Sequence, residues 1–237
     1  MSINNIVITN NIWPNKVNQN FISNFLSQPN QRWILHVLFL RIPKNASSSM
    51  MKLLGNYNLI KKHEQKFTSQ ADSKIYKGWF DPTHATQEEV YKVLRGDAQK
   101  SFSFCIVRNP WSRAVSMYHF SKKMKLNHLY GIHENISFNE FVEIMNDFRL
   151  NKHFIATFPQ TKWTKGPIQL DEILKFETLS SDYKKMREKY SLFHLAENVP
   201  HENSTEHDVY QKYYDSHTKK MVELIFEEDV DEFKYLF

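Results

Sequence analysis

The sequence predicts an α/β fold in which a central, mostly parallel sheet is flanked by helices. Two apolar stretches each lead through a polar turn into a helical pattern, and further strand-like and helix-like stretches alternate along the chain. Such alternation is typical of parallel sheets. With 237 residues, 41% of them hydrophobic, the chain can bury the core of one domain. We expect a polar lead-in over residues 1–32 and a single domain over residues 33–237.

The first strand and helix follow the polar lead-in directly. Residues 33–40 are apolar at nearly every position, as in a strand that is buried on both faces of a parallel sheet. After a polar turn, residues 50–54 have a helical pattern that Gly55 closes. The same order returns further on, with a strand at residues 101–107, a turn, and a helix at residues 111–123.

The remaining predicted elements lie between and after these two units. They are a strand at residues 74–80, helices at 86–95 and 137–148, a strand at 168–176, a helix at 181–190 and a helical region at 209–230. Two of the helices begin with a capping box, which Thr86 forms with Glu89 and Ser137 forms with Glu140.

The composition excludes several classes of protein. Cys105 is the single cysteine, so no disulfide can form within the chain, and its apolar neighbours indicate a small buried side chain. The N-terminus lacks the cationic start and apolar stretch of a signal peptide. The most apolar window, residues 33–40, is far shorter than the roughly 20 residues that cross a bilayer. We therefore expect a cytoplasmic protein without a transmembrane segment.

The turn after the first strand has features of an anion-binding site. A helix N-terminus presents unpaired N–H groups and about half a positive charge. This turn adds the ammonium group of Lys44 and the hydroxyl groups of Ser47, Ser48 and Ser49. It is not a Walker A loop, because that motif needs two glycines and this turn has none. Taken alone, the turn is also compatible with an ordinary helix start that is capped by serine.

The turn after the second strand is basic as well. Arg108 stands at the end of the strand, and Ser116 lies in the helix that follows. Arginine can hold a phosphate group with two parallel hydrogen bonds, although Arg108 taken alone is equally compatible with a salt bridge inside the protein. The formal net charge of +5 agrees with an anionic partner. Together, the two turns indicate a ligand with phosphate groups at both ends.

Two motifs at these turns resemble the sulfotransferase superfamily and, within it, the carbohydrate 2-O-sulfotransferase-like branch. The first motif resembles the 5'-phosphosulfate loop of that branch and reads Ile42-Pro43-Lys44-Asn45-Ala46-Ser47-Ser48-Ser49. The second, at residues 104–118, resembles the 3'-phosphate segment in its residues Arg108, Pro110, Arg113, Ser116 and Tyr118. Weaker similarity covers most of the chain after residue 33. Asn45 departs from the threonine or serine that is common in the family.

The resemblance implies a P-loop-like fold of three layers and a sulfotransferase that uses 3'-phosphoadenosine 5'-phosphosulfate. The sulfuryl group would pass to an acceptor hydroxyl, on a carbohydrate by analogy with the branch, and leave adenosine 3',5'-bisphosphate, without a metal. The implied donor-binding residues are Pro43, Lys44, Asn45, Ala46, Ser47, Ser48, Ser49, Arg108 and Ser116.

The resemblance also implies two catalytic residues. Lys44 would neutralise charge on the bridging and leaving oxygens, and His84, just ahead of a capped helix, would be the general base. The alternative for His84 is that it only packs against its own turn, in which case His63, His119 and His128 are the other candidates.

Two other functions remain open at this point. A P-loop-type nucleotide kinase would need the glycines that the first turn lacks. A non-catalytic nucleotide-binding or nucleic-acid module could use the lysine pairs at 61–62 and 122–123, but no nucleic-acid motif accompanies them, and we expect no nucleic-acid partner. No histidine spacing with a third ligand indicates a metal site. Gln160, Asn203 and Ser204 are either ordinary loop residues or part of an acceptor or adenine pocket.

Overall fold

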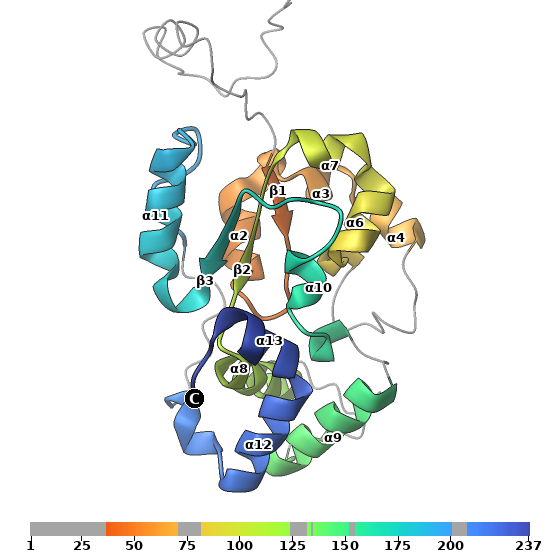
Figure 1. Ribbon diagram of the computed structural model, residues 1–237, viewed down its shortest axis with the longest axis vertical. Coiled ribbons are helices and arrows are strands. Elements are labelled where there is room, and N and C mark those ends of the chain that lie inside the picture. Colours follow the sequence, from red (N-terminus) through yellow and green to blue (C-terminus); the bar gives the residue numbers. More distant parts are fainter. Residues whose placement is uncertain (1–36, 71–81, 124–131, 134, 152–154, 201–207) are drawn as a thin grey trace, which may run out of the picture. The chain divides into compact units, whose positions relative to one another are not determined.

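A parallel sheet of three strands lies at the centre of the described part of the chain (Figure 1). Its order is β1 (Val37–Leu40), β2 (Phe102–Val107) and β3 (Glu172–Lys175). This computed structural model describes residues 37–70, 82–123, 132–133, 135–151, 155–200 and 208–237, which all belong to the compact unit Ile34–Phe237. The sheet and the helices around it confirm the predicted α/β fold, although the strand expected at 74–80 lies outside the described residues.

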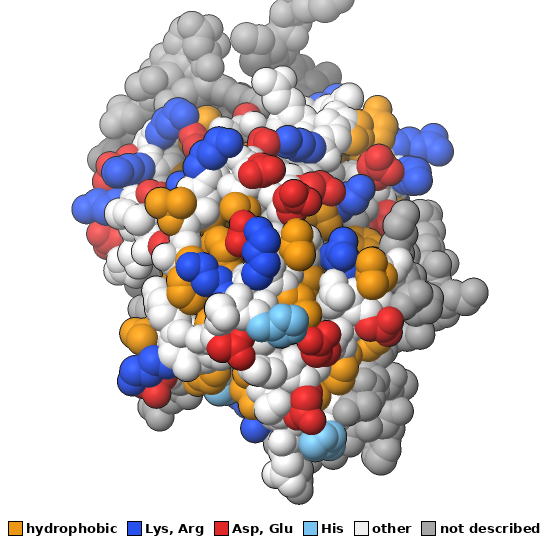
Figure 2. Space-filling model, turned by 60° about the horizontal axis from the view of Figure 1, so that its bottom comes forward, with side chains coloured by type: hydrophobic (Ala, Val, Ile, Leu, Met, Phe, Trp, Pro, Cys, Tyr) orange, Lys and Arg blue, Asp and Glu red, His pale blue; other side chains and the backbone are white. Residues whose placement is uncertain are grey.

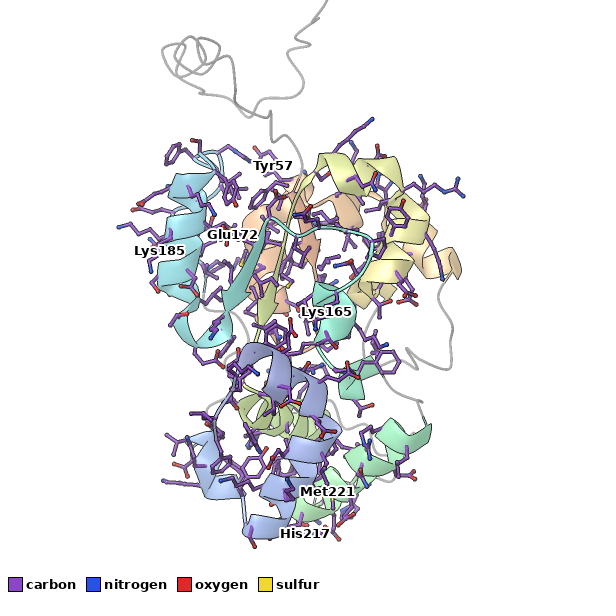
Figure 3. All side chains as sticks on the ribbon, viewed as in Figure 1. Tyr57, Lys165, Glu172, Lys185, His217 and Met221 are labelled. Atoms are coloured by element: carbon purple, nitrogen blue, oxygen red, sulfur yellow. The ribbon has the colours of Figure 1, made fainter. Side chains whose placement is uncertain are left out.

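Helices cover both faces of the sheet and give the fold its layers. Alternate residues of β1 and β2 point to opposite faces, as the pleat of a strand requires. On one face, Phe39 and Phe104 pack with residues of α2 (Ser47–Leu54) and α11 (Leu179–Lys189), while Lys185 of α11 points outward (Figure 3). On the other face, Leu40 and Cys105 pack in a larger cluster that includes residues of α6 (Gln87–Leu94), α8 (Pro110–Lys123), α9 (Phe138–Asn151) and α12 (Ser216–Ile225).

The other helices connect the strands or follow them. In the described part of the chain, the other α-helices are α3 (Leu59–Lys62), α4 (Glu64–Gln70), α6, α7 (Gly96–Lys100), α8, α9, α10 (Thr161–Thr164), α12 and α13 (Glu227–Phe233). Short 3-10 helices occur at Gly55–Tyr57, Pro82–His84, Ile155–Thr157, Phe176–Thr178 and Tyr210–Tyr213. Among the described residues, no helix combines the length and apolar character that a membrane span needs.

Local capping signals fix the starts of α6 and α9. Glu89 accepts hydrogen bonds of 2.7 Å from both the backbone N–H and the hydroxyl of Thr86. Glu140 makes the same pair of bonds to Ser137, at 2.8 and 2.7 Å. Both predicted capping boxes are therefore confirmed, because each satisfies N–H groups that a helix start would otherwise leave unpaired. The predicted closure of α2 at Gly55 is also confirmed, by a φ of 48° at its C-cap.

The C-terminal helical region is not continuous, contrary to the prediction of one region over 209–230. Asp215 starts a new helix, since its Oδ1 accepts a hydrogen bond of 2.7 Å from Thr218 N. The chain leaves helical geometry again at Phe226, and α13 begins beyond it with acidic residues, which favour a helix N-terminus. The strand predicted at 168–176 is shortened to β3, since Ile168 N donates to a side chain of α6 instead.

Candidate functional site

The candidate residues follow the carboxyl ends of the strands, which meet at one edge of the sheet. Because the strands are parallel, the turn at 41–46, Arg108 and Phe176 all leave the sheet at that edge (Figure 1). Arg108 Nη1 donates a hydrogen bond of 3.1 Å to Lys44 O. The structure therefore brings together the two basic turns that the sequence predicts.

The backbone of the first turn is bent by two residues in the left-handed region. Lys44 has a φ of 69° and Ala46 a φ of 56°, although neither is glycine. Two hydrogen bonds to Ile42 O hold the bend, from Asn45 N at 3.3 Å and from Ser47 Oγ at 2.8 Å. Alternation of left-handed and ordinary conformations turns successive N–H groups toward one side, which forms a concavity suited to an anion.

The start of α2 adds further N–H groups to this turn. Ala46 is the N-cap of α2, and no side chain caps this helix. The N-terminal helical turn of α2 contains no acidic residue. Ser48 is exposed, whereas Ser49 is buried. The Ser47 hydroxyl already donates its hydrogen to Ile42 O. The donors that the helix start can offer to an anion are therefore chiefly its backbone N–H groups and the Ser48 hydroxyl.

The ammonium group of Lys44 is held in a partly desolvated position. Its Nζ lies 3.9 Å from the centroid of the Phe120 ring, in a cation–π contact. Burial, together with the positive charges of Arg108 and Lys123, lowers the pKa of Lys44 to about 8. Lys44 therefore remains mostly protonated at neutral pH, and a bound anion would stabilise its charge.

Arg108 is buried and positioned by contacts with both neighbouring strand ends. Its Nε donates to Ser112 Oγ at 3.0 Å, and its guanidinium carbon lies 4.0 Å from the centroid of the Phe176 ring. Burial lowers the pKa of Arg108 to about 10. The negative charge of Glu177 raises this pKa and so opposes part of the effect of burial. Among the described residues, Nη2 has no hydrogen-bond acceptor. Arg108 therefore keeps its charge and one nitrogen for a ligand.

Ser116 lies on α8, on the helix face that points to the first turn. Its neighbour one turn further along the helix is Phe120, whose ring contacts the ammonium group of Lys44. Ser116 is 7% exposed. Ser116 therefore lies one helical turn from the ring that contacts Lys44.

His84 lies beside the end of β1, and its hydrogen bond fixes its tautomer. His84 Nδ1 is 2.9 Å from Arg41 O. Because a carbonyl oxygen only accepts, Nδ1 carries the hydrogen, and Nε2 of the neutral ring is the unprotonated nitrogen. The Trp163 indole N–H donates to His84 O at 3.0 Å, and the Arg41 side chain is hydrogen-bonded to Thr83 Oγ1. His84 thus has the tautomer that a general base needs.

The other candidate histidines have different surroundings. His119 Nε2 lies 2.8 Å from the hydroxyl of Tyr213. His63 is the C-cap of α3, and burial together with nearby lysines lowers its pKa. His128 lies outside the described residues. Of the candidates that the structure describes, His84 is the one with a hydrogen bond to the first turn, at Arg41 O.

Gln160 does not line a pocket, which corrects one of the alternatives for it. Its side chain is completely buried, and protein groups use both its oxygen and its nitrogen. Asn203 and Ser204 lie outside the described residues. The sequence analysis assigned no role to Asp229, which is 0% exposed and accepts hydrogen bonds from Gln160. A local pattern could not reveal it, because the two residues are 69 positions apart.

Charges of both signs are mixed on one face of the molecule. On the face shown in Figure 2, the described lysine and arginine side chains alternate with aspartate and glutamate and do not form one basic area. Among the residues that the structure describes, no group of three or more histidine, cysteine, aspartate or glutamate side chains could hold a metal ion.

Comparisons with known proteins identify the family of the chain. The search of curated proteins and the search of solved structures found no match. A family model described as "Sulfotransferase family" matches residues 34–236, a range that includes both basic turns and all three strands. Because the match covers most of the 237 residues, the chain belongs to the sulfotransferase family, whose members transfer sulfur-containing groups to acceptors.

Proposed function

We propose that the protein transfers a sulfuryl group from 3'-phosphoadenosine 5'-phosphosulfate to a hydroxyl group of a carbohydrate. The observation that carries this proposal is the 3.1 Å hydrogen bond from Arg108 Nη1 to Lys44 O. It joins two basic turns directly, so that one nucleotide can reach both with phosphate groups at its two ends. A nucleotide with a single phosphate-bearing end would leave one of the turns without an anion.

The residues of the two turns fit such a donor. Neither Lys44 nor Arg108 forms an ion pair with a carboxylate among the described residues. Burial lowers the pKa of both, which means that each cation has lost solvation without a full counter-charge. An anion bound between Lys44 and Arg108 would supply the missing counter-charge. The N–H groups at the start of α2 supply further donors.

The proposed roles follow from these positions. When bound, the donor supplies an activated sulfuryl group attached to a phosphate leaving group. The first turn holds the 5'-phosphate with its N–H groups, and Lys44 stabilises the negative charge that develops on the leaving oxygen. Arg108 and Ser116 hold the 3'-phosphate. These placements orient the donor for attack by a hydroxyl.

His84 is the proposed general base. Its Nε2 accepts the proton of the acceptor hydroxyl, and the hydrogen bond from Nδ1 to Arg41 O stabilises the imidazolium that forms. A base in this role typically contributes about 10²- to 10⁴-fold to the rate. The carbohydrate acceptor is supported by the resemblance of residues 42–49 to the 5'-phosphosulfate loop of carbohydrate 2-O-sulfotransferases.

The proposal is tested by measuring transfer from labelled donor to sugar, phenol and lipid acceptors. We expect wild-type protein to label sugars, His84→Ala to bind donor normally but lose about 10²-fold or more in kcat, and Lys44→Ala to lose both binding and rate. His119→Ala is the matched histidine control and should keep the wild-type rate. Normal transfer by His84→Ala, or its loss in His119→Ala, would show that the base is wrongly assigned.

The same preparation separates this proposal from a nucleotide kinase. Adenosine 3',5'-bisphosphate at about 100 times its Kd should stabilise the fold by roughly 2.7 kcal/mol without magnesium. ATP with magnesium should have little effect on the melting temperature. The opposite ranking of the two ligands would favour the kinase.

A further inference from the structure

The side-chain amide of Gln160 bonds to both basic turns at once. Its Oε1 accepts hydrogen bonds from Asn45 Nδ2 in the first turn, at 2.6 Å, and from Arg108 N in the second, at 2.9 Å. Its Nε2 donates to Arg108 O at 2.9 Å and to Asp229 Oδ2 at 3.1 Å. Gln160, Asn45 and Asp229 are each 0% exposed. One buried amide therefore links the two turns to each other and to α13.

Asp229 fixes the amide from the opposite side. Its Oδ1 accepts hydrogen bonds from Gln160 N at 2.5 Å and from Thr161 N at 3.3 Å. Asp229 also forms a buried ion pair of 3.7 Å with Arg113, whose Nε donates to Pro43 O at 3.2 Å. Because Pro43 is the residue before Lys44, this second chain of contacts also ends in the first turn.

We propose that Gln160, held by Asp229, is a positioning residue that fixes the spacing between the two turns and so makes the site select nucleotides with phosphate groups at both ends. The inference rests on the proposed function. It deepens that function by giving a physical cause for the choice of a bisphosphorylated nucleotide, which the cations of the turns alone do not supply.

Rigid spacing matters because a ligand gains affinity from a second phosphate group only when both phosphate sites can be occupied at the same time. After the first phosphate is bound, the second binds as if at high local concentration, provided that its site already lies at the right distance. A hydrogen-bonded link buried in a low-dielectric interior resists change in that distance more strongly than an exposed one. Without the link, part of the energy of the second phosphate would be used to order the turns.

Glutamine meets the chemical requirements of this position. Its side chain must accept hydrogen bonds from Asn45 Nδ2 and Arg108 N, and an amide oxygen does so. It must also donate to Arg108 O and Asp229 Oδ2, and an amide NH₂ group does so. Methionine has a similar length but cannot donate. Gln160→Met therefore removes the link while it keeps most of the side-chain volume.

The test compares the Kd of adenosine 3',5'-bisphosphate with the Kd values of adenosine 5'-monophosphate and adenosine 3'-monophosphate. The preference of wild type for the bisphosphate should fall by about 10-fold in Gln160→Met, within the usual range of coupling between two sites. Affinity for each monophosphate should change by less than about 2-fold. In transfer assays the donor KM should rise more than kcat falls.

Thr161→Val is the matched control. The neighbouring Thr161 is also buried, and its hydroxyl donates to Glu228 Oε2 of α13 at 2.7 Å rather than to either turn. It should keep the wild-type preference. An equal loss of preference in Thr161→Val would indicate a general effect of the contact between α10 and α13 and would overturn the inference.

Asn45→Ala is the second variant, and it decides the question if Gln160→Met does not fold. It removes the bond from Asn45 Nδ2 to Gln160 Oε1, together with the 2.7 Å bond from the same nitrogen to Ile106 O, but leaves the bonds from Gln160 to Arg108. Preference for the bisphosphate should fall while affinity for the 3'-monophosphate stays constant; unchanged preference in a folded variant overturns the inference. If wild type itself does not prefer the bisphosphate, the proposed function fails, and the two failures are therefore distinguishable.

Discussion

The lysine of the first turn combines a positive charge with an environment that disfavours it. Burial is the largest cause of its lowered pKa, and the charges of Arg108 and Lys123 act in the same direction. The sequence marked Lys44 as a candidate, because a lysine before serines at a helix start is a local pattern. It could not indicate the pKa, since Arg108, Lys123 and the ring of Phe120 come from other segments.

This environment makes ligand binding dependent on pH. In the absence of ligand, Lys44 loses its proton around its pKa of about 8, whereas a bound anion raises that pKa. Affinity for adenosine 3',5'-bisphosphate should therefore be constant up to about pH 8 and then fall by up to about 10-fold per pH unit. Titration calorimetry between pH 7.5 and 9.5 measures the effect, over a range in which the phosphates are already ionised.

Two variants identify the group that titrates. Lys44→Met should bind more weakly and lose the dependence on pH. Lys123→Gln should move the fall in affinity to higher pH, because it removes one of the charges that lower the pKa of Lys44. An unchanged pH profile in Lys44→Met would mean that another group is responsible.

At the scale of elements, local signals were sufficient wherever an element carries its own boundaries. β2 and α8 agree with their predicted ranges to within one residue, since a buried strand, a turn with Pro110 and a helical pattern follow one another directly. The short α10 was not predicted. Its place depends on Gln87 of α6, which donates to Trp163 O at 3.2 Å, and no local pattern encodes a partner so far away in sequence.

Gly166 allows the segment after α10 to approach α6. Its φ is 156°, and a Cβ atom there would overlap the side chain of Gln87, whose Oε1 accepts a hydrogen bond of 2.9 Å from Ile168 N. Gly166→Ala should therefore lower the free energy of unfolding by about 1–3 kcal/mol in urea denaturation. Gly96→Ala is the matched control, because its Cβ would meet nothing within 4 Å. It should be neutral or stabilising by up to about 1 kcal/mol.

At the scale of the whole molecule, one buried ion pair connects segments that are far apart in sequence. Arg113 on α8 donates to Pro43 O, Phe158 O and Ala156 O, at 3.2, 3.1 and 3.2 Å, and lies 3.7 Å from Asp229 of α13. The arginine was visible in the sequence as part of a motif. Its role as a connection between these segments was not, because every partner comes from elsewhere in the chain.

Removal of this arginine should strongly destabilise the fold. Arg113→Met leaves Asp229 as an unpaired buried charge, at a cost of about 3–5 kcal/mol in the free energy of unfolding at pH 8. Burial already raises the pKa of Asp229 to about 6, and loss of Arg113 raises it further. Because the folded state then binds a proton more readily than the unfolded state, the variant should recover stability as the pH falls from 8 to 5.

The control for this prediction is the exposed ion pair of Lys165, labelled in Figure 3, with Glu232 of α13. Lys165→Met should change the free energy of unfolding by less than about 1 kcal/mol at either pH, since solvent screens the pair. Urea denaturation at pH 5 and pH 8 measures both variants. A cost of Arg113→Met that is equal at the two pH values would contradict the assignment to Asp229.

The position of Cys105 makes selective chemistry at the site practical. It is the single cysteine of the chain, it lies in the central strand with 0% exposure, and burial raises the pKa of its thiol. Such a thiol resists alkylating reagents in the folded protein. A cysteine introduced at the exposed Ser48 would then be the one reactive thiol, and because Ser48 belongs to the proposed phosphate site, slower alkylation of this thiol in the presence of nucleotide would report binding at the first turn without removal of the native cysteine.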